Sequence, residues 1–309
     1  MSAMLRAAVF GACLSFAGAA VAAGDAGLPS VTVTAPRPPT TQELAGDAVP
    51  NFVRSHSTPS RVIGQLTRWR TPVCPWAKGL GDAMDNFVTS RIRAIAAAVG
   101  APRDESPKCK PNVLILFVLD PVKQVAILLQ SESASLGFHY QAETKSFTAF
   151  THPVQGWYVT STRNWKGLET VDNPHALSTL DSAVGFEGIG TPPPGDPSSR
   201  LDNYISSQVV LATIIADLNK ITGMTIGSLS DYIAVLTLTQ ARLSEGCSQL
   251  PSIMDLMSPG CPSEKRPDQV TAGDLAYLRA LYSANLETPV EIERSNIEAA
   301  MLRGFADRS

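Results

Sequence analysis

Two absences narrow what this sequence can encode. Its longest apolar run, residues 7–20, falls short of the roughly 20 apolar residues that a membrane-spanning helix needs, and much of it is Ala and Gly. The chain has 25 basic residues against 28 acidic ones, so it lacks the basic surplus that is typical of nucleic-acid-binding proteins. We therefore expect neither a transmembrane span nor a nucleic acid partner.

The signatures of common enzyme classes are also missing. The sequence has no Gly-x-Ser-x-Gly, no Ser-x-x-Lys, no His-Glu-x-x-His, no P-loop and no Gly-x-Gly-x-x-Gly. Histidine, the most frequent general base, occurs only four times. These absences favour a non-catalytic protein that binds no metal and no cofactor, although they leave open catalysis by residues from distant segments.

The N-terminus has the three zones of an export signal. Arg6 supplies a positive charge, residues 7–20 form the apolar zone, and the Ala-Val-Ala-Ala sequence of residues 20–23 offers a cleavage site. We expect residues 1–23 to be a signal peptide and the mature protein to be periplasmic or secreted. Lipid attachment at Cys13 is the alternative.

Cysteine placement is the most informative positive feature. Cys13 lies inside the signal, and the other four are Cys74, Cys109, Cys247 and Cys261. An even set behind an export signal is typical of a protein closed by disulfides. Of the three possible pairings we prefer Cys74–Cys109, which brackets a predicted helix, and Cys247–Cys261, which closes a short segment between two helices. Neither pair has the Cys-x-x-Cys spacing of structural zinc sites.

Two segments have no sustained periodicity. Residues 24–59 are rich in Pro, Thr, Ser and Ala, so we expect a mostly disordered tether there. Residues 172–203 contain the run Thr-Pro-Pro-Pro-Gly-Asp-Pro, which predicts a long surface loop within one domain or, alternatively, a domain boundary.

The remaining pattern predicts an α+β fold in a single disulfide-braced domain, residues 60–309, with a mixed sheet and several packed helices. Apolar residues spaced by three and four, among them Met84, Phe87, Val88 and Ile92, predict one buried face of a helix that ends at Gly100. Continuous apolar runs predict buried strands, and capping signals predict the starts of further helices. The strands expected from such runs are 112–119 and 208–216. Residues 145–151 and 156–163 carry β-leaning residues, which predict a hairpin or two successive strands. The expected later helices begin at about 120, 228, 271 and 288.

Short motifs are spread along this domain: Arg68-Trp69, Val73-Cys74-Pro75, Gly100-Ala101-Pro102, Asp231-Tyr232-Ile233-Ala234 and residues 274–282. The pattern resembles that of uncharacterised exported proteins of Gram-negative bacteria, and the resemblance implies no known activity. The layout also resembles secreted metalloprotease-like domains, in which an edge strand precedes the metal-binding helix. The corresponding helix, within residues 225–242, has no histidine. The resemblance therefore implies a domain whose metal site is missing.

Four residues are candidates for ligand binding. Arg68, Trp69 and Trp157 are of the types that anchor binding surfaces, but tryptophans near a disulfide suit a core equally well. Asp217 ends a buried strand, where it could bind a ligand or shape a turn. Our leading hypothesis is an exported, non-catalytic module that binds a protein or cell-envelope ligand through a groove lined by Arg68, Trp69 or Trp157.

The alternative hypothesis is a periplasmic or secreted hydrolase acting on a peptide or cell-wall substrate. His139 and Glu143 have the i,i+4 spacing of a helical pair, and His152 could join them at a metal. Asp120 and Asp217 follow predicted strands and could meet these residues in one cleft, although Asp120 is fully explained as a helix cap. The sequence determines neither the ligand nor the oligomeric state.

Overall fold

The computed structural model describes residues 44–106, 108–131, 133–137, 149–164, 168–172, 205–242, 245–285 and 287–307. The predicted signal peptide, the first part of the predicted tether and nearly all of the predicted loop at 172–203 lie outside these residues. Among the described helices, none combines the length and the hydropathy that crossing a bilayer requires.

The described residues form helices and a mixed sheet, which confirms the α+β prediction. The helices are α2 (Val49–His56), α3 (Asp82–Val99), α4 (Pro121–Ser131), α7 (Ile226–Thr239), α8 (Ala272–Ser283) and α9 (Val290–Ala306). A π-helical turn (Leu44–Ala48) precedes α2, and the short 3-10 helices are η2 (Ser133–Leu136), η4 (Ile253–Met257) and η5 (Ser263–Lys265). The strands are β1 (Thr67–Trp69), β2 (Pro75–Lys78), β3 (Val113–Val118), β4 (Val154–Arg163), β5 (Glu169–Val171) and β6 (Ser206–Asp217).

Strand β6 is the centre of the sheet. The order is β2-β3-β6-β4-β5, with β4 antiparallel to β6 along one edge. Along the other edge, β1 pairs in parallel with residues 207–209 and β3 with residues 212–217. All 12 residues of β6 are buried, as a long apolar run predicts for a strand covered on both faces.

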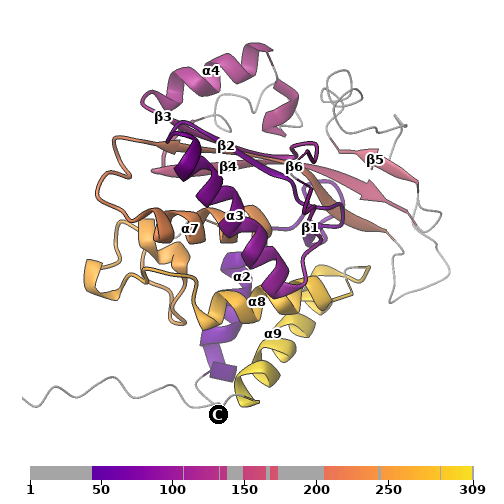
Figure 1. Cartoon of the computed structure of the whole chain (residues 1–309). Coiled ribbons are helices and arrows are strands. Elements are labelled where there is room, and N and C mark those ends of the chain that lie inside the picture. The colour runs from indigo at the N-terminus through magenta and orange to yellow at the C-terminus, as the bar shows by residue number, and fades with distance from the viewer. Residues whose placement is uncertain are drawn as a thin grey trace, which may run out of the picture. The chain divides into compact units, whose positions relative to one another are not determined.

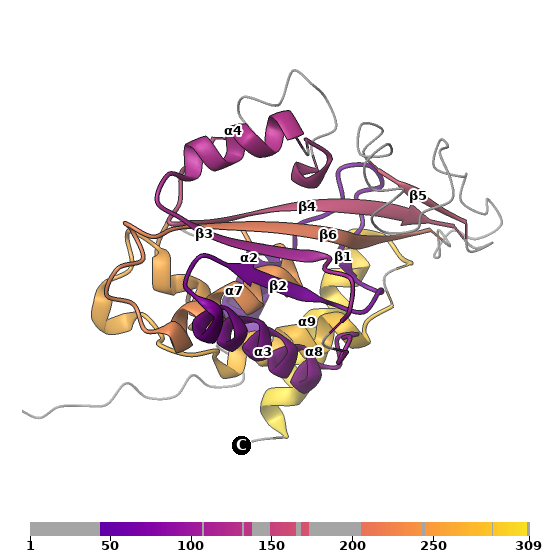
Figure 2. The same ribbon diagram turned by 45° about the horizontal axis from the view of Figure 1, so that its top comes forward.

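Helices cover both faces of the sheet, as Figures 1 and 2 show. Helix α4 and η2 lie on one face, where Val125, Leu128 and Leu136 pack against Trp157 and Ile215. Helices α3 and α7 lie on the other face. Helices α2, α8 and α9 form a second cluster beyond them.

Several helix ends follow the predicted capping signals. Gly100 ends α3 in the left-handed conformation at φ 76°, which glycine adopts without strain. The Asp120 Oδ1 atom accepts the N–H of Lys123 at 2.9 Å and so caps the start of α4. Thr271 and Asp274 form the capping box at the start of α8.

The structure corrects the predicted end of the tether. Residues 44–56 are helical, and the side chains of Val49, Phe52, Val53 and His56 are buried. These four residues are spaced by three and four, which is a helical pattern. The Pro-, Ser- and Thr-rich surroundings hid it, but Pro50 lies in the first turn of α2, where the ring of proline is tolerated.

Both preferred disulfides are present. Cys74 is bonded to Cys109 with Cα atoms 6.0 Å apart, and Cys247 to Cys261 with Cα atoms 4.6 Å apart. Loop-closure entropy predicts a stabilisation of about 4 kcal/mol for the first and about 3 kcal/mol for the second. The first crosslink brackets β2 and α3, and the second closes the segment that contains η4.

A buried carboxylate joins α9 to the chain in front of β1. The N–H of Leu66 donates to Glu293 Oε2 at 2.8 Å, and Glu293 is 0% exposed. Its other oxygen has no hydrogen-bond partner among the described residues. Burial raises the pKa of Glu293 to about 7, although the Leu66 N–H and the guanidinium groups of Arg68 and Arg294 act in the opposite direction.

This carboxyl makes stability depend on pH. Because its pKa is higher in the folded than in the unfolded chain, the free energy of unfolding should fall as the pH rises from about 4.5 to about 7. Glu293→Gln cannot ionise and keeps an oxygen for Leu66. We expect urea denaturation to show that this variant gains stability relative to the parent protein between pH 5 and pH 8.

The control is Glu264→Gln, which removes one negative charge from an exposed position in η5. It should follow the pH profile of the parent protein. Parallel profiles for the parent protein and Glu293→Gln would contradict the role given to Glu293.

Candidate functional site

The two tryptophans predicted to bind a ligand lie in the core, on opposite faces of the sheet. Trp69 is 1% exposed and donates its indole N–H to the carbonyl of Thr237 at 2.9 Å. Trp157 is 2% exposed and packs against the residues of α4 and η2. The core interpretation therefore holds for both indoles, and neither offers a surface to a ligand.

The other two predicted binding residues also have structural partners. Arg68 is half-buried and donates from Nη1 to the carbonyl of Leu281 at 2.7 Å. Asp217 is buried at the end of β6, where its Oδ1 accepts the N–H of Asn219 at 3.0 Å and shapes a turn. The structure does not bring Arg68, Trp69, Trp157 and Asp217 together into one groove.

The residues of the hydrolase hypothesis are only partly described. His139 and Glu143 lie outside the described residues. Asp120 follows β3 and His152 precedes β4. Because β3 is parallel and β4 antiparallel to β6, both residues lie at the same end of the sheet as Asp217.

Each of these three side chains has a local contact. Asp120 caps α4, Asp217 binds the turn that follows it, and His152 Nδ1 lies 2.8 Å from the hydroxyl of Thr151. Within the described ranges, no three His, Cys, Asp or Glu side chains are placed to hold a metal ion.

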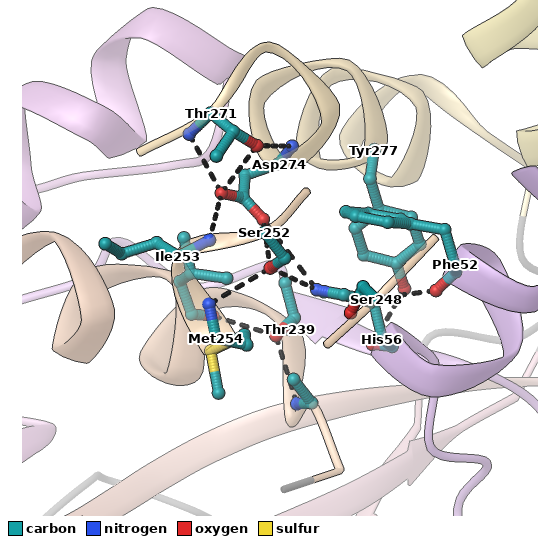
Figure 3. A network of polar contacts seen from close by, with 12 residues as sticks. Phe52, His56, Thr239, Ser248, Ser252, Ile253, Met254, Thr271, Asp274 and Tyr277 are labelled. Atoms are coloured by element: carbon teal, nitrogen blue, oxygen red, sulfur yellow. Dashed lines mark hydrogen bonds and ion pairs between the residues drawn. The ribbon is translucent and has the colours of Figure 1, made fainter. Parts of the chain in front are cut away.

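Sequence reasoning missed a buried polar network that joins α2, η4 and α8 (Figure 3). His56 Nε2 lies 3.0 Å from Ser252 Oγ, and Ser252 donates its hydroxyl to Asp274 Oδ1 at 2.6 Å. The same hydroxyl oxygen accepts the N–H of Met254 and caps η4. The imidazole stacks on Phe52 with ring centroids 3.9 Å apart.

The network is satisfied from every side. Asp274 Oδ2 accepts the N–H groups of Ile253 and Thr271, each at 2.9 Å. His56 Nδ1 lies 2.9 Å from the carbonyl oxygen of Phe52. Such bonds offset the cost of removing a carboxylate and an imidazole from water.

A serine, a histidine and an aspartate in contact suggest a hydrolase triad, but the order differs. In a triad the histidine lies between the serine and the aspartate, so that it can take the hydroxyl proton. Here Ser252 lies between His56 and Asp274, and its proton is directed to the carboxylate. All three residues are at most 2% exposed, so a substrate could not reach them in this structure.

Burial and the neighbouring polar groups act on the imidazole in opposite directions. Desolvation lowers the pKa of His56, while Asp274 and the carbonyl of Phe52 act in the opposite direction. The network fixes α2 against the segment closed by the Cys247–Cys261 disulfide, which is a structural role. The one signal in the sequence was Ser252 before an aspartate three residues later, which is the spacing of a capping box.

A groove lies between α3, the first half of α7 and the segment before α8. Its volume is about 460 Å³. Its lining includes Phe87, Arg91 and Ala94 from α3, Ser228 and Asp231 from α7, and Asp268. A volume of this size falls within the range of ligand-binding sites.

An ion pair fixes the floor of this groove. Asp231 is 1% exposed and binds the guanidinium of Arg91 through both carboxylate oxygens, with Nη2 and Oδ2 3.0 Å apart. The hydrogen bond to Asp231 raises the pKa of Arg91. Asp231 Oδ2 also accepts the N–H of Val270 at 2.8 Å, and Ser228 Oγ donates to the carbonyl of Asp268 at 2.6 Å. The three walls are therefore tied together.

Apolar side chains are exposed along one wall. Phe87 is 45% exposed and Met84, about one turn earlier on α3, is 50% exposed. The prediction that both lie on the buried face of the helix is wrong. Val88 and Ile92 fill that face, and the apolar stripe is too wide for one helix face to bury. The width of the apolar stripe on α3 was the feature of the sequence that indicated an exposed apolar surface.

The structural role of the buried network can be tested at its centre. Ser252→Ala removes both the cap of η4 and the bond to Asp274, so we expect a loss of about 2 kcal/mol in the free energy of unfolding. Ser283→Ala makes the same change at an exposed position of α8 and should stay within about 0.5 kcal/mol of the parent protein. Chemical denaturation measures both. Equal stabilities of the two variants would contradict the role of the network.

Comparisons of the chain with protein-family models, with curated proteins and with solved structures gave no match. A function for this chain must therefore be argued from its own residues.

Proposed function

We propose that the protein is an exported, non-catalytic module that binds a segment of a protein ligand in the groove between α3 and α7. The observation that carries the proposal is the exposed ring of Phe87 beside polar groups that are fixed by buried hydrogen bonds. An apolar anchor combined with a few fixed polar groups is the usual composition of a binding site.

The shape of the groove favours a protein segment over a compact small molecule. Two helices form two of its three walls, and the apolar surface continues past the groove to Met84. Fully burying a phenylalanine side chain contributes about 2 to 3 kcal/mol, so covering the exposed half of Phe87 would contribute about 1 kcal/mol. A segment lying along α3 could cover both side chains.

The two disulfides support the proposed export of the protein and the proposed binding site. Disulfides persist in oxidising compartments, which agrees with the predicted signal peptide. Cys74–Cys109 brackets α3, which forms one wall, and Cys261 precedes the segment of Asp268 by seven positions. Covalent bracing near both walls would limit the conformational entropy that is lost on binding.

The test uses peptides selected from a random phage-displayed library against the folded, disulfide-bonded protein. We expect the selected peptides to bind the parent protein and to lose about tenfold in affinity against Phe87→Ser or Ala94→Arg, as measured by fluorescence anisotropy. The first variant removes the apolar anchor, and the second fills the groove from an exposed position of α3.

Matched controls separate the groove from the rest of the surface. Ile127 on α4 is 46% exposed, close to the value of Phe87, and Ala97 is exposed on α3 but does not line the groove. Ile127→Ser and Ala97→Arg should leave the affinities unchanged. Failure to select any peptide, or equal losses in the control variants, would contradict the proposal.

A further inference from the structure

The charge of the groove depends on three of its lining residues, Arg91, Asp231 and Asp268. Arg91 and Asp231 neutralise each other through the bonds described above. Asp268 is exposed, and among the described residues its carboxylate has neither an ion pair nor a hydrogen bond. The groove is left with one uncompensated negative charge.

The carboxylate of Asp268 stands on a backbone that is held on both sides. Its own carbonyl oxygen accepts the hydroxyl of Ser228 at 2.6 Å, and the N–H two residues later, that of Val270, binds Asp231 at 2.8 Å. A backbone held in this way loses little entropy when a partner binds the side chain that it carries. The position suits a specific ion pair more than a mobile surface charge.

The start of α7 favours an anion in the groove, whereas Asp268 favours a cation, but the effect of the helix start is weaker. A helix N-terminus carries about half a positive charge, which would favour an anion. One of the first-turn N–H groups of α7 is already taken, because Ser228 donates to Thr225 Oγ1. The full charge of Asp268 therefore dominates.

Phe87 adds a second preference of the same sign. Its ring is 45% exposed and lines the same groove as Asp268. The face of an aromatic ring attracts an ammonium or guanidinium group. Both features favour a positive charge next to an apolar side chain.

Building on the proposed function, we propose that the groove recognises a basic peptide segment in which a Lys or Arg side chain pairs with Asp268 and a neighbouring apolar side chain packs on Phe87. A neutral or acidic segment would leave Asp268 without a counter-charge. The partner would therefore be a protein with an exposed, basic and partly apolar segment.

The sequences of the selected peptides and three substitutions test this inference. We expect Lys or Arg next to an apolar residue to be enriched in the selected peptides. Asp268→Asn should weaken their binding about fivefold at 50 mM NaCl, and Asp268→Lys should weaken it further. At 300 mM NaCl the difference between the parent protein and Asp268→Asn should shrink, because salt screens an exposed pair. Glu264→Gln, at an exposed glutamate that does not line the groove, should have no effect.

The outcomes separate this inference from the proposed function. The selected peptides could be neutral or acidic, bind Asp268→Asn as tightly as the parent protein, and still fail to bind Ala94→Arg. That result would overturn the basic specificity and leave the groove as the binding site. Peptides that bind equally to Ala94→Arg would overturn both.

Discussion

The pairing of β6 with three other strands is the constraint on which the fold depends. All 12 residues of this strand are buried, and both of its edges are occupied. Its backbone groups thus find partners away from water, which a buried strand requires. Helix α4 on one face and helices α3 and α7 on the other are positioned by the apolar side chains that β3, β4 and β6 present. The groove is a consequence of how α3 and α7 pack on this sheet.

The elements that depend on local pattern could be predicted from the sequence. Strand β3 is a continuous apolar run and the centre of β6 is mostly apolar. Helices α3, α7, α8 and α9 have apolar periodicity or capping signals close to their observed ends. The disulfide pairing could also be predicted, because each bond closes a loop around one or two elements. These features need little information from distant residues.

The features that were missed depend on contacts between distant segments. Helix α2 has only eight residues, so its stability comes from packing on α8 and α9, and its short helical pattern does not reveal those distant partners. His56 is buried because Ser252 and Asp274, about 200 positions later, bind it. Trp69 and Trp157 suited a surface and a core equally well from sequence, and only the tertiary structure decides for the core.

The buried network and the groove differ in whether their polar groups already have partners. The side chains of His56, Ser252 and Asp274 are hydrogen-bonded to one another and buried, so they hold α2, η4 and α8 together. The groove has the opposite character, with an exposed ring and a carboxylate that lacks a partner among the described residues. Unused interaction capacity at a fixed position is what a partner can bind. Residue type alone does not identify such a position, because Arg68, Trp69 and Trp157 are of types that anchor binding surfaces and yet have structural partners.

The position of β6 in the chain has a consequence for biogenesis. Thr67 of β1 pairs with Ser207 of β6, 140 positions later. Strands β3 and β4 also pair with β6 and precede it in the chain. During synthesis from the N-terminus, the first two thirds of the polypeptide would emerge without the template that organises its sheet. Nascent chains of this topology expose apolar strands for longer, and non-local pairing slows folding. A chaperone that holds the unfinished chain until residue 217 has appeared would suit such an architecture.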